Sequence, residues 1–148
     1  MRRTSGLGLV ELLIAIPLLV ALMFLGANRF NHARLAAHRA EVPTNVEGIR
    51  TASIAYHASW GKFVEITSWT PSSNITSLAR SWVTGTNFDT MSWSPDEARI
   101  RGRYKVESTS TTDFLVTGEC DLDEDYNNAS FTATKSLRAK LNTAADVY

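Results

Sequence analysis

The strongest pattern in the sequence is an apolar run near its start, residues 7–27, in which Glu11 is the one ionisable side chain. At 1.5 Å per residue a helix over this run is about 31 Å long, enough to cross the roughly 30 Å hydrocarbon core of a bilayer. Arg2 and Arg3 precede the run, and basic residues in this place hold an N-terminus in the cytoplasm. The pattern therefore predicts a membrane-spanning helix.

Glu11 needs an explanation of its own. A carboxylate costs about 2.5–3.5 kcal/mol at mid-membrane and requires a cationic partner, which residues 7–27 do not contain. Cleavage between Gly6 and Leu7 would create one, because a free α-amino group has a pKa of about 8. A cleaved secretory signal fits less well, because its apolar core is shorter and no convincing cleavage site follows the run. An uncleaved membrane anchor explains the length of the run but not Glu11.

The segment SGLGLVELLIAIP resembles the N-terminus of type IV pilins and the related pseudopilins. That family has a short basic leader ending in Gly, then an apolar helix with Glu as its fifth residue. Gly6 matches the leader glycine, Leu7 the first mature residue, which is usually Phe, and Glu11 the glutamate. The resemblance implies cleavage after Gly6 by a prepilin peptidase, N-methylation of Leu7, and pairing of Glu11 with the N-terminal amine of a neighbouring subunit during assembly.

Helix-compatible residues continue through residues 28–60, which we expect to form an amphipathic continuation of the first helix. Its apolar face follows a spacing of three and four residues, with Val46, Ile49, Ser53, Tyr56 and Trp60 on one side. A proline inside a helix removes one backbone hydrogen bond. We therefore expect bends at Pro17 and Pro43, with Thr44 or Asn45 capping the restart after the second.

Beyond residue 61 the pattern changes to short strands. Apolar and polar residues alternate in residues 99–108, 112–119 and 129–136, which predicts antiparallel strands. The inward-facing candidates are Ile100, Tyr104, Val106, Phe114, Val116, Phe131 and Ala133. Residues 75–83 are predicted to form a short helix, and Trp69, Trp82 and Trp93 to anchor loops on the sheet.

The predicted fold class is α+β and pilin-like: a long N-terminal helix, half transmembrane and half amphipathic, packed on a small antiparallel β-meander head. The expected divisions are a leader peptide (1–6), a transmembrane or filament-core helix (7–27), its amphipathic continuation (28–60) and a β-rich head (61–148). The resemblance to pilins covers residues 1–60 well and the head only loosely.

Composition narrows the functional classes. The chain has 148 residues, with 15 basic and 15 acidic side chains and a net charge of zero, which argues against general binding to polyanions. A single Cys, Cys120, excludes an internal disulfide. Because no nucleophile motif or metal-spaced His pair occurs, we expect no enzymatic activity.

Four basic residues, Arg99, Arg101, Arg103 and Lys105, alternate along one predicted strand and face away from its apolar side. Three interpretations remain open. The face is solvated and paired with Glu107, Asp113 or a neighbouring strand; it contacts an acidic patch of the next subunit; or it binds DNA, whose phosphates attract clustered Arg and Lys.

An acidic segment, GECDLDEDYNN, carries Asp121, Asp123 and Asp125 at the alternate spacing of a calcium loop. Tyr126 and Thr132 stand where an EF-hand requires Gly and Glu, which excludes that motif. A simpler Ca²⁺ site with oxygen ligands is one interpretation, and the resemblance adds that some pseudopilins carry calcium in this region. The others are a solvated acidic turn and a patch that pairs with residues 99–105.

The function that these features favour is that of a structural subunit of a type IV pilus or pseudopilus. Its expected partners are copies of itself and other pilins, the prepilin peptidase, an inner-membrane assembly platform and, before assembly, membrane lipid. The expected location is the inner membrane, with the head outside the cytoplasm, and then a surface pilus or periplasmic pseudopilus. The alternatives are a minor or tip pilin that binds DNA or a surface, a pseudopilin of a type II secretion system, and an uncleaved anchor.

Overall fold

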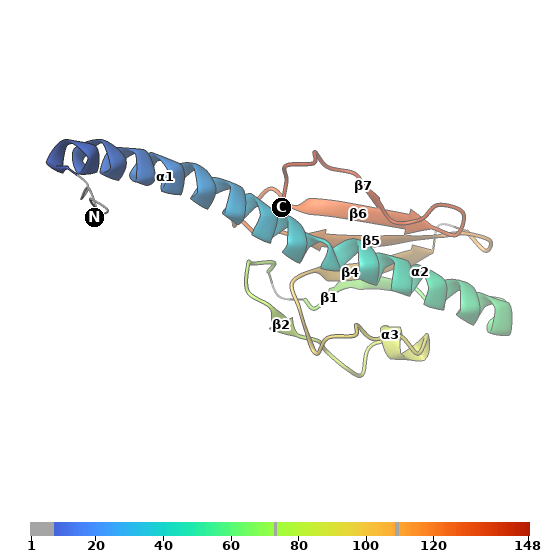
Figure 1. Ribbon diagram of the computed structural model, residues 1–148. Helices are drawn as coiled ribbons and strands as arrows, with labels where there is room; N and C mark the ends of the chain where they lie inside the picture. The colour runs from blue at the N-terminus through green and yellow to red at the C-terminus, as the bar shows by residue number, and fades with distance from the viewer. Residues whose placement is uncertain (1–7, 73, 109) are drawn as a thin grey trace, which may run out of the picture. The chain divides into compact units, whose positions relative to one another are not determined.

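The computed structural model describes residues 8–72, 74–108 and 110–148, without the side chains of residues 25–28 (Figure 1). The fold is α+β: a long N-terminal helical region is followed by a five-stranded antiparallel sheet, as the sequence predicts at this level. The chain divides into two compact units, Met1–Arg34 and Leu35–Tyr148. The expected boundaries of the leader, the transmembrane helix and the head stay predictions.

Helix α1 (Leu9–Arg39) carries the apolar run, and it continues without interruption through Pro17. The missing N–H of Pro17 removes one backbone bond, to the carbonyl of Leu13. The turns on either side keep the helix continuous, so the bend expected at Pro17 does not end it.

Helix α2 (Glu41–Trp60) is separated from α1 only by a turn at Ala40. Pro43 lies in the first turn of α2 and cannot donate to the carbonyl of Arg39, which explains why regular hydrogen bonding lapses at this point. The predicted capping of the restart is wrong, since no side chain caps α2 at its N-terminus. The Thr44 hydroxyl instead donates to the carbonyl of Ala40 at 3.0 Å.

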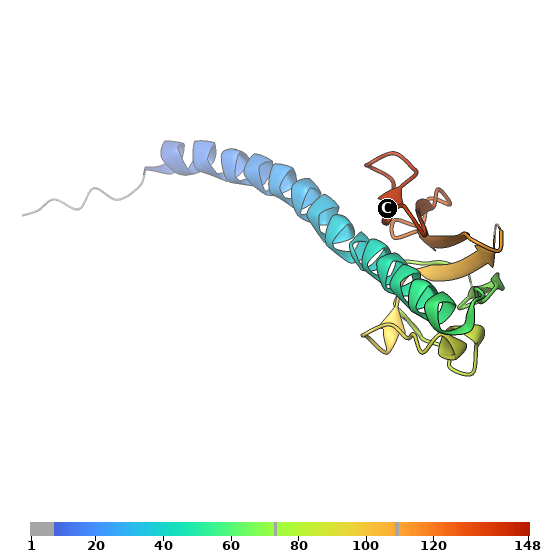
Figure 2. The same ribbon diagram turned by 90° about the vertical axis from the view of Figure 1, so that its right-hand side faces the viewer.

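The main sheet has the order β1-β4-β5-β6-β7, with every neighbouring pair antiparallel. Its strands are β1 (Ile66–Thr70), β4 (Arg103–Ser108), β5 (Phe114–Cys120), β6 (Ala129–Thr134) and β7 (Lys140–Leu141). Val106 pairs with Val116, and Val116 pairs with Ala133, so the inward residues of three strands form one row. Helix α2 packs on this face, as Figures 1 and 2 show.

A second, two-stranded sheet lies on the β1 side of α2 (Figure 1) and pairs β2 (Arg80–Ser81) with β3 (Arg99–Ile100). The helix predicted for residues 75–83 is therefore wrong, because Arg80 and Ser81 form a strand with partners about 20 residues away. A short helix that the sequence pattern did not predict, α3 (Asn87–Thr90), comes between β2 and β3 along the chain.

The core lies between α2 and the main sheet. All seven predicted inward-facing residues are buried, together with Val42, Val46 and Ile49 from α2. Gly118, in the central strand β5, permits the helix to come close, because an added Cβ would lie 2.5 Å from the Val46 Cγ2 atom. The predicted apolar face of α2 is confirmed except at its end, where Trp60 is 69% exposed.

An aromatic cluster extends this core towards the smaller sheet. Trp82 and Trp93 contact each other, Phe88 of α3 and Tyr104 of β4, at ring-centroid distances of 5.4–6.5 Å. The phenol of Tyr104 accepts a hydrogen bond from the Asn45 amide at 2.8 Å, and burial raises the pKa of this tyrosine. The predicted anchoring role of Trp82 and Trp93 is thus confirmed.

Candidate functional site

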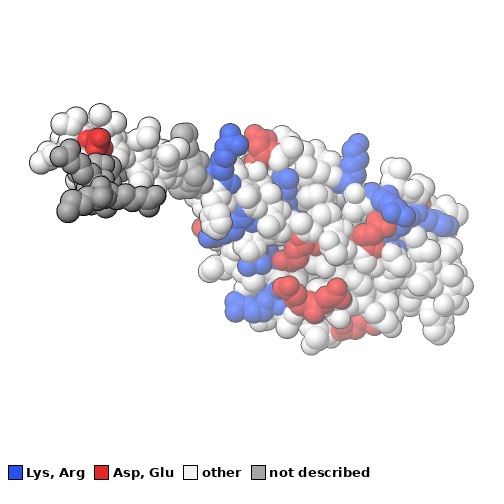
Figure 3. Space-filling view, in the orientation of Figure 1, with Lys and Arg blue, Asp and Glu red and all other residues white. Residues whose placement is uncertain are grey.

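The apolar turns of α1 are exposed along their whole length. The large apolar side chains of residues 9–24 are 46–80% exposed, whereas those facing the core from α2 are buried. By length and composition, the helical region that begins at Leu9 can span a membrane. Where Figure 3 draws the surface of these turns, acidic atoms appear at one place and the rest is uncharged. Such an apolar surface requires a lipid or protein environment.

Glu11 lies in the first turn of this exposed helix. Its Oε2 atom accepts the backbone N–H of Gly8 at 2.6 Å, which satisfies one of the amide groups that a helix leaves unpaired at its start. Its Oε1 atom has no hydrogen-bond partner within the described part of the chain. Gly6 and Leu7, the residues expected at the processing site, lie outside the described residues. As far as residues 8–72, 74–108 and 110–148 are concerned, one oxygen of the carboxylate is therefore available for a further cation.

The acidic segment forms the loop between β5 and β6, and the structure brings its three alternate aspartates together. Each of Asp121, Asp123 and Asp125 offers one carboxylate oxygen, and these oxygens lie within 4.8 Å of one another. Glu124 points elsewhere: its Oε1 atom accepts the Ser77 N–H and hydroxyl at 3.1 and 2.7 Å. These bonds lower the pKa of the Glu124 carboxyl.

Asp121 is the buried member of this group and is only 5% exposed. Its Oδ2 atom accepts the Tyr126 N–H at 3.2 Å, but its Oδ1 atom is buried and has no hydrogen-bond partner among the residues that the structure describes. The pKa of Asp123 is raised by partial desolvation and by the negative charges of Asp125 and Asp121. Three carboxylates thus converge, and no ion pair with any of them occurs within the described residues. An oxygen-preferring cation suits such a point.

The basic strand residues are already paired with acids. Arg103 contacts Glu119 of the neighbouring strand β5 at 2.9 Å, and Lys105 contacts Glu107 at 3.0 Å. Both cations also lie over the ring of Trp69, at 4.4 and 5.1 Å from its centroid. Trp69 therefore covers the outer face of the sheet. Its position depends on the pairing of β1 with β4, which the sequence did not predict.

The single strand predicted for residues 99–108 is wrong, because the structure divides it between two sheets: Arg99 belongs to β3 of the smaller sheet and Arg101 to the turn after it. Arg101 contacts Glu41 of α2 at 3.7 Å, and Arg99 donates to the carbonyl of Ala79 at 2.6 Å. Figure 3 likewise shows basic and acidic side chains interspersed on the face that it draws. The pairing of Lys105 with Glu107 and of Arg103 with the neighbouring strand agrees with the first of the three interpretations, a solvated face paired with nearby acids.

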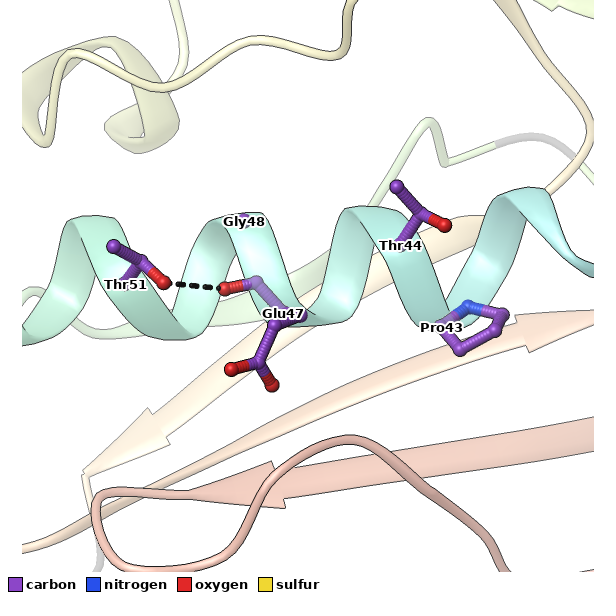
Figure 4. Close-up of a pocket in the computed structure, with 5 residues that line it drawn as sticks. All are labelled: Pro43, Thr44, Glu47, Gly48 and Thr51. Carbon is purple, nitrogen blue, oxygen red and sulfur yellow. Dashed lines mark hydrogen bonds between the residues drawn. The ribbon is translucent and has the colours of Figure 1, made fainter.

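A shallow hollow of about 630 Å³ runs along one side of α2 and is drawn in Figure 4. It is lined by Pro43, Thr44, Glu47, Gly48 and Thr51. Its single ionisable side chain, Glu47, is engaged by Arg50 at 2.9 Å and by the N–H of Ala139 at 3.1 Å. The hollow therefore offers no free reactive group, and the expectation that the chain is not an enzyme stays a prediction.

Comparisons of the chain with protein-family models, with curated proteins and with solved structures found no match. The resemblance to pilins therefore rests on the sequence pattern alone, mainly that of residues 1–60. Two arrangements are suited to binding: the exposed apolar helix with Glu11, and the convergent aspartates of the β5–β6 loop.

Proposed function

We propose that this chain is the structural subunit of a type IV pilus or pseudopilus, processed after Gly6 and polymerised through the apolar turns of α1. The observation that carries the proposal is the combination of an exposed apolar stretch of helix with one carboxylate in its first turn. Before assembly the helix lies in the inner membrane, and afterwards it packs against the same helix of other copies.

Glu11 supports this function through its Oε1 atom, which no described residue engages. The bond from Gly8 occupies Oε2, so a cation at Oε1 adds to the helix cap without replacing it. Processing after Gly6 exposes the amine of Leu7, which then forms a charge-assisted pair with Glu11 of a neighbouring copy. In an apolar environment this pair is strong and selects one register between adjacent helices.

The experiment compares the full chain with Glu11→Ala and with Glu65→Ala, which removes an exposed glutamate from the head. Intact mass of membrane-extracted wild-type chain should show loss of residues 1–6 and gain of one methyl group. Glu11→Ala should insert into membranes at least as well as wild type, because the buried acid is gone, but should lower the yield of sheared filaments at least tenfold. Glu65→Ala should assemble normally.

Two results contradict the proposal. If working material retains residues 1–6, the chain is an uncleaved anchor that carries a head domain. If Glu11→Ala forms filaments at the wild-type yield, the pairing of Glu11 with an N-terminal amine is wrong.

The alternative of a minor or tip pilin that binds DNA or a surface is less well supported, because Arg101, Arg103 and Lys105 already contact carboxylates. Replacing Arg101 and Arg103 by Gln tests it. Lost DNA uptake or adhesion with a normal filament yield favours the tip role, whereas unchanged uptake and adhesion favour the purely structural one. A pseudopilin role is distinguished by loss of protein secretion when the chain is deleted.

A second proposal concerns the β5–β6 loop, which we propose binds Ca²⁺ through Asp121, Asp123 and Asp125. The observation that favours it is the buried, unpartnered Oδ1 atom of Asp121. Oxygens that share one calcium ion at 2.3–2.6 Å lie up to about 5 Å apart, and the three carboxylates fall within this limit. Bound calcium also removes the mutual repulsion that raises the pKa of Asp123.

Thermal unfolding of the full chain in detergent tests the calcium proposal. Calcium at 1 mM should raise the melting temperature by at least about 4 °C at pH 7. Magnesium should act more weakly, because it demands a tighter octahedral site. Asp121→Asn should abolish the rise, whereas Asp146→Asn, an exposed control, should keep it. The effect should fade as pH drops through the raised pKa of Asp123, because protons then compete for the ligands. No rise with the wild-type chain at pH 7 would refute the site.

A further inference from the structure

An acidic groove lies where the end of α1 and the start of α2 meet residues 95–100. Its volume is about 320 Å³, and the residues that line it include the small or apolar Ala37, Ala40 and Ile100. Its acidic residues are Glu41, Asp96 and Glu97. We call this feature the acidic groove.

The charges of the acidic groove are not balanced. Glu41 is occupied by Arg101, whose backbone N–H lies 2.9 Å from one carboxylate oxygen and whose guanidinium lies 3.7 Å from the other. Asp96 and Glu97 are exposed, and their carboxylates have no hydrogen bond or ion pair within residues 8–72, 74–108 and 110–148. Two carboxylates without partners in the described residues thus lie beside small and apolar lining residues. This combination suits Arg or Lys, whose side chains carry a cation at the end of an aliphatic stem.

The same chain carries a complementary segment. Residues 28–39 contain no acidic side chain, and two of their arginines, Arg29 and Arg34, are exposed without a charged or hydrogen-bonded partner in the described part of the molecule. Ala33 and Ala36 beside them are also exposed. A helix surface that combines Arg with small neighbours can approach a groove closely.

Position along the chain favours a second copy as the occupant. Arg34 precedes Glu41 by about two helical turns, or about 10 Å along a helix axis. Parallel helices displaced by this amount would place Arg34 of one copy beside the acidic groove of the next. Other exposed cations, such as Lys62 and Arg138, follow α2 in the sequence and belong to the head.

We propose that the acidic groove receives Arg34, supported by Arg29, from a second copy of this chain. The inference rests on the proposed assembly through α1 and adds the electrostatic contact that sets how far adjacent copies are displaced. Asp96 and Glu97 are the accepting residues, and the aliphatic stem of Arg34 lies on Ala37 and Ala40.

Charge reversal on full chains tests this contact. The groove variant carries Asp96→Arg and Glu97→Arg, the stem variant carries Arg29→Glu and Arg34→Glu, and a control carries Lys62→Glu and Arg138→Glu. Each is expressed alone, and the first two are also expressed together. Sheared filaments are weighed, and unchanged thermal unfolding of the head verifies that each variant folds.

Each reversed variant alone should lower the filament yield at least fivefold, whereas the control should stay within twofold of wild type. Expressing the groove and stem variants together should restore at least half of the wild-type yield, because each then meets its opposite charge on the other chain. A contact within one chain would not be restored in this way.

Normal yield from either reversed variant alone, or no recovery on co-expression, would overturn the inference and leave the proposed function standing. If wild-type chains form no filament, the proposed function fails and this inference fails with it.

Discussion

Helices α1 and α2 contain apolar residues of the same kinds, yet these residues have opposite environments. Ile49 of α2 is fully buried, whereas Ile14 of α1 is 63% exposed. The difference lies in what each helix packs on: α2 has the inner face of the sheet, and the apolar turns of α1 have no such partner in the chain that the structure describes. The stability of the head therefore comes from within the chain, while the environment of α1 has to come from outside it.

The largest expected effect comes from truncating these two isoleucines. Ile49→Ala should lower the free energy of unfolding of the head by about 2–5 kcal/mol, because it leaves a cavity between α2 and β5. Ile14→Ala should change it by less than about 0.5 kcal/mol, because no head residue depends on this side chain. Urea unfolding of the full chain in detergent measures both. Equal losses would contradict the division of roles between the two helices.

A smaller effect is expected where α2 approaches the sheet most closely. Gly118→Ala should cost about 1–3 kcal/mol, because the new Cβ meets Val46 and Val42 of the helix at 2.5 and 3.0 Å. Gly48→Ala is the matched comparison on α2. Its Cβ would lie 2.7 Å from the Nε1 atom of Trp93, so this ring has to shift, but the three nearest atoms belong to that one side chain and alanine is the better helix former. Its net cost should therefore be smaller than that of Gly118→Ala. The same urea titration ranks the two, and the reverse order would show that α2 does not pack as described.

The smallest expected signal is the reaction of Cys120 with a maleimide. This thiol is buried, and burial raises its pKa to about 12, so the reactive thiolate is scarce in the folded head at pH 8. Raising the pH from 7 to 9 should accelerate labelling of urea-unfolded chain but hardly that of folded chain. Ile14→Ala should leave the folded rate unchanged, and Ile49→Ala should raise it through more frequent opening. Rapid labelling of the folded wild type would contradict a closed core around β5.

Local spacing accounts for the parts of the fold that the sequence predicted. The two-residue alternation of Ile100, Tyr104 and Val106 and the three- and four-residue spacing of Val46 and Ile49 identify the faces that are buried. The helix predicted for residues 75–83 failed because Arg80 and Ser81 pair with residues distant in sequence, which local propensity does not register. Trp60 shows a similar limit, since its spacing fits the buried face but its side chain is exposed.

In the candidate sites, too, some features follow from adjacent residues and others depend on the tertiary structure. The sequence by itself determined the exposed apolar helix, the position of Glu11 within it and the alternation of Asp121, Asp123 and Asp125, because each is a property of adjacent residues. Only the tertiary structure decided that Glu124 turns away to Ser77, that Arg103 is neutralised by Glu119, and that Asp96 and Glu97 border a groove beside α2. These arrangements join residues far apart in the chain, and their distances are set by the packing of the helix, the two sheets and the loops.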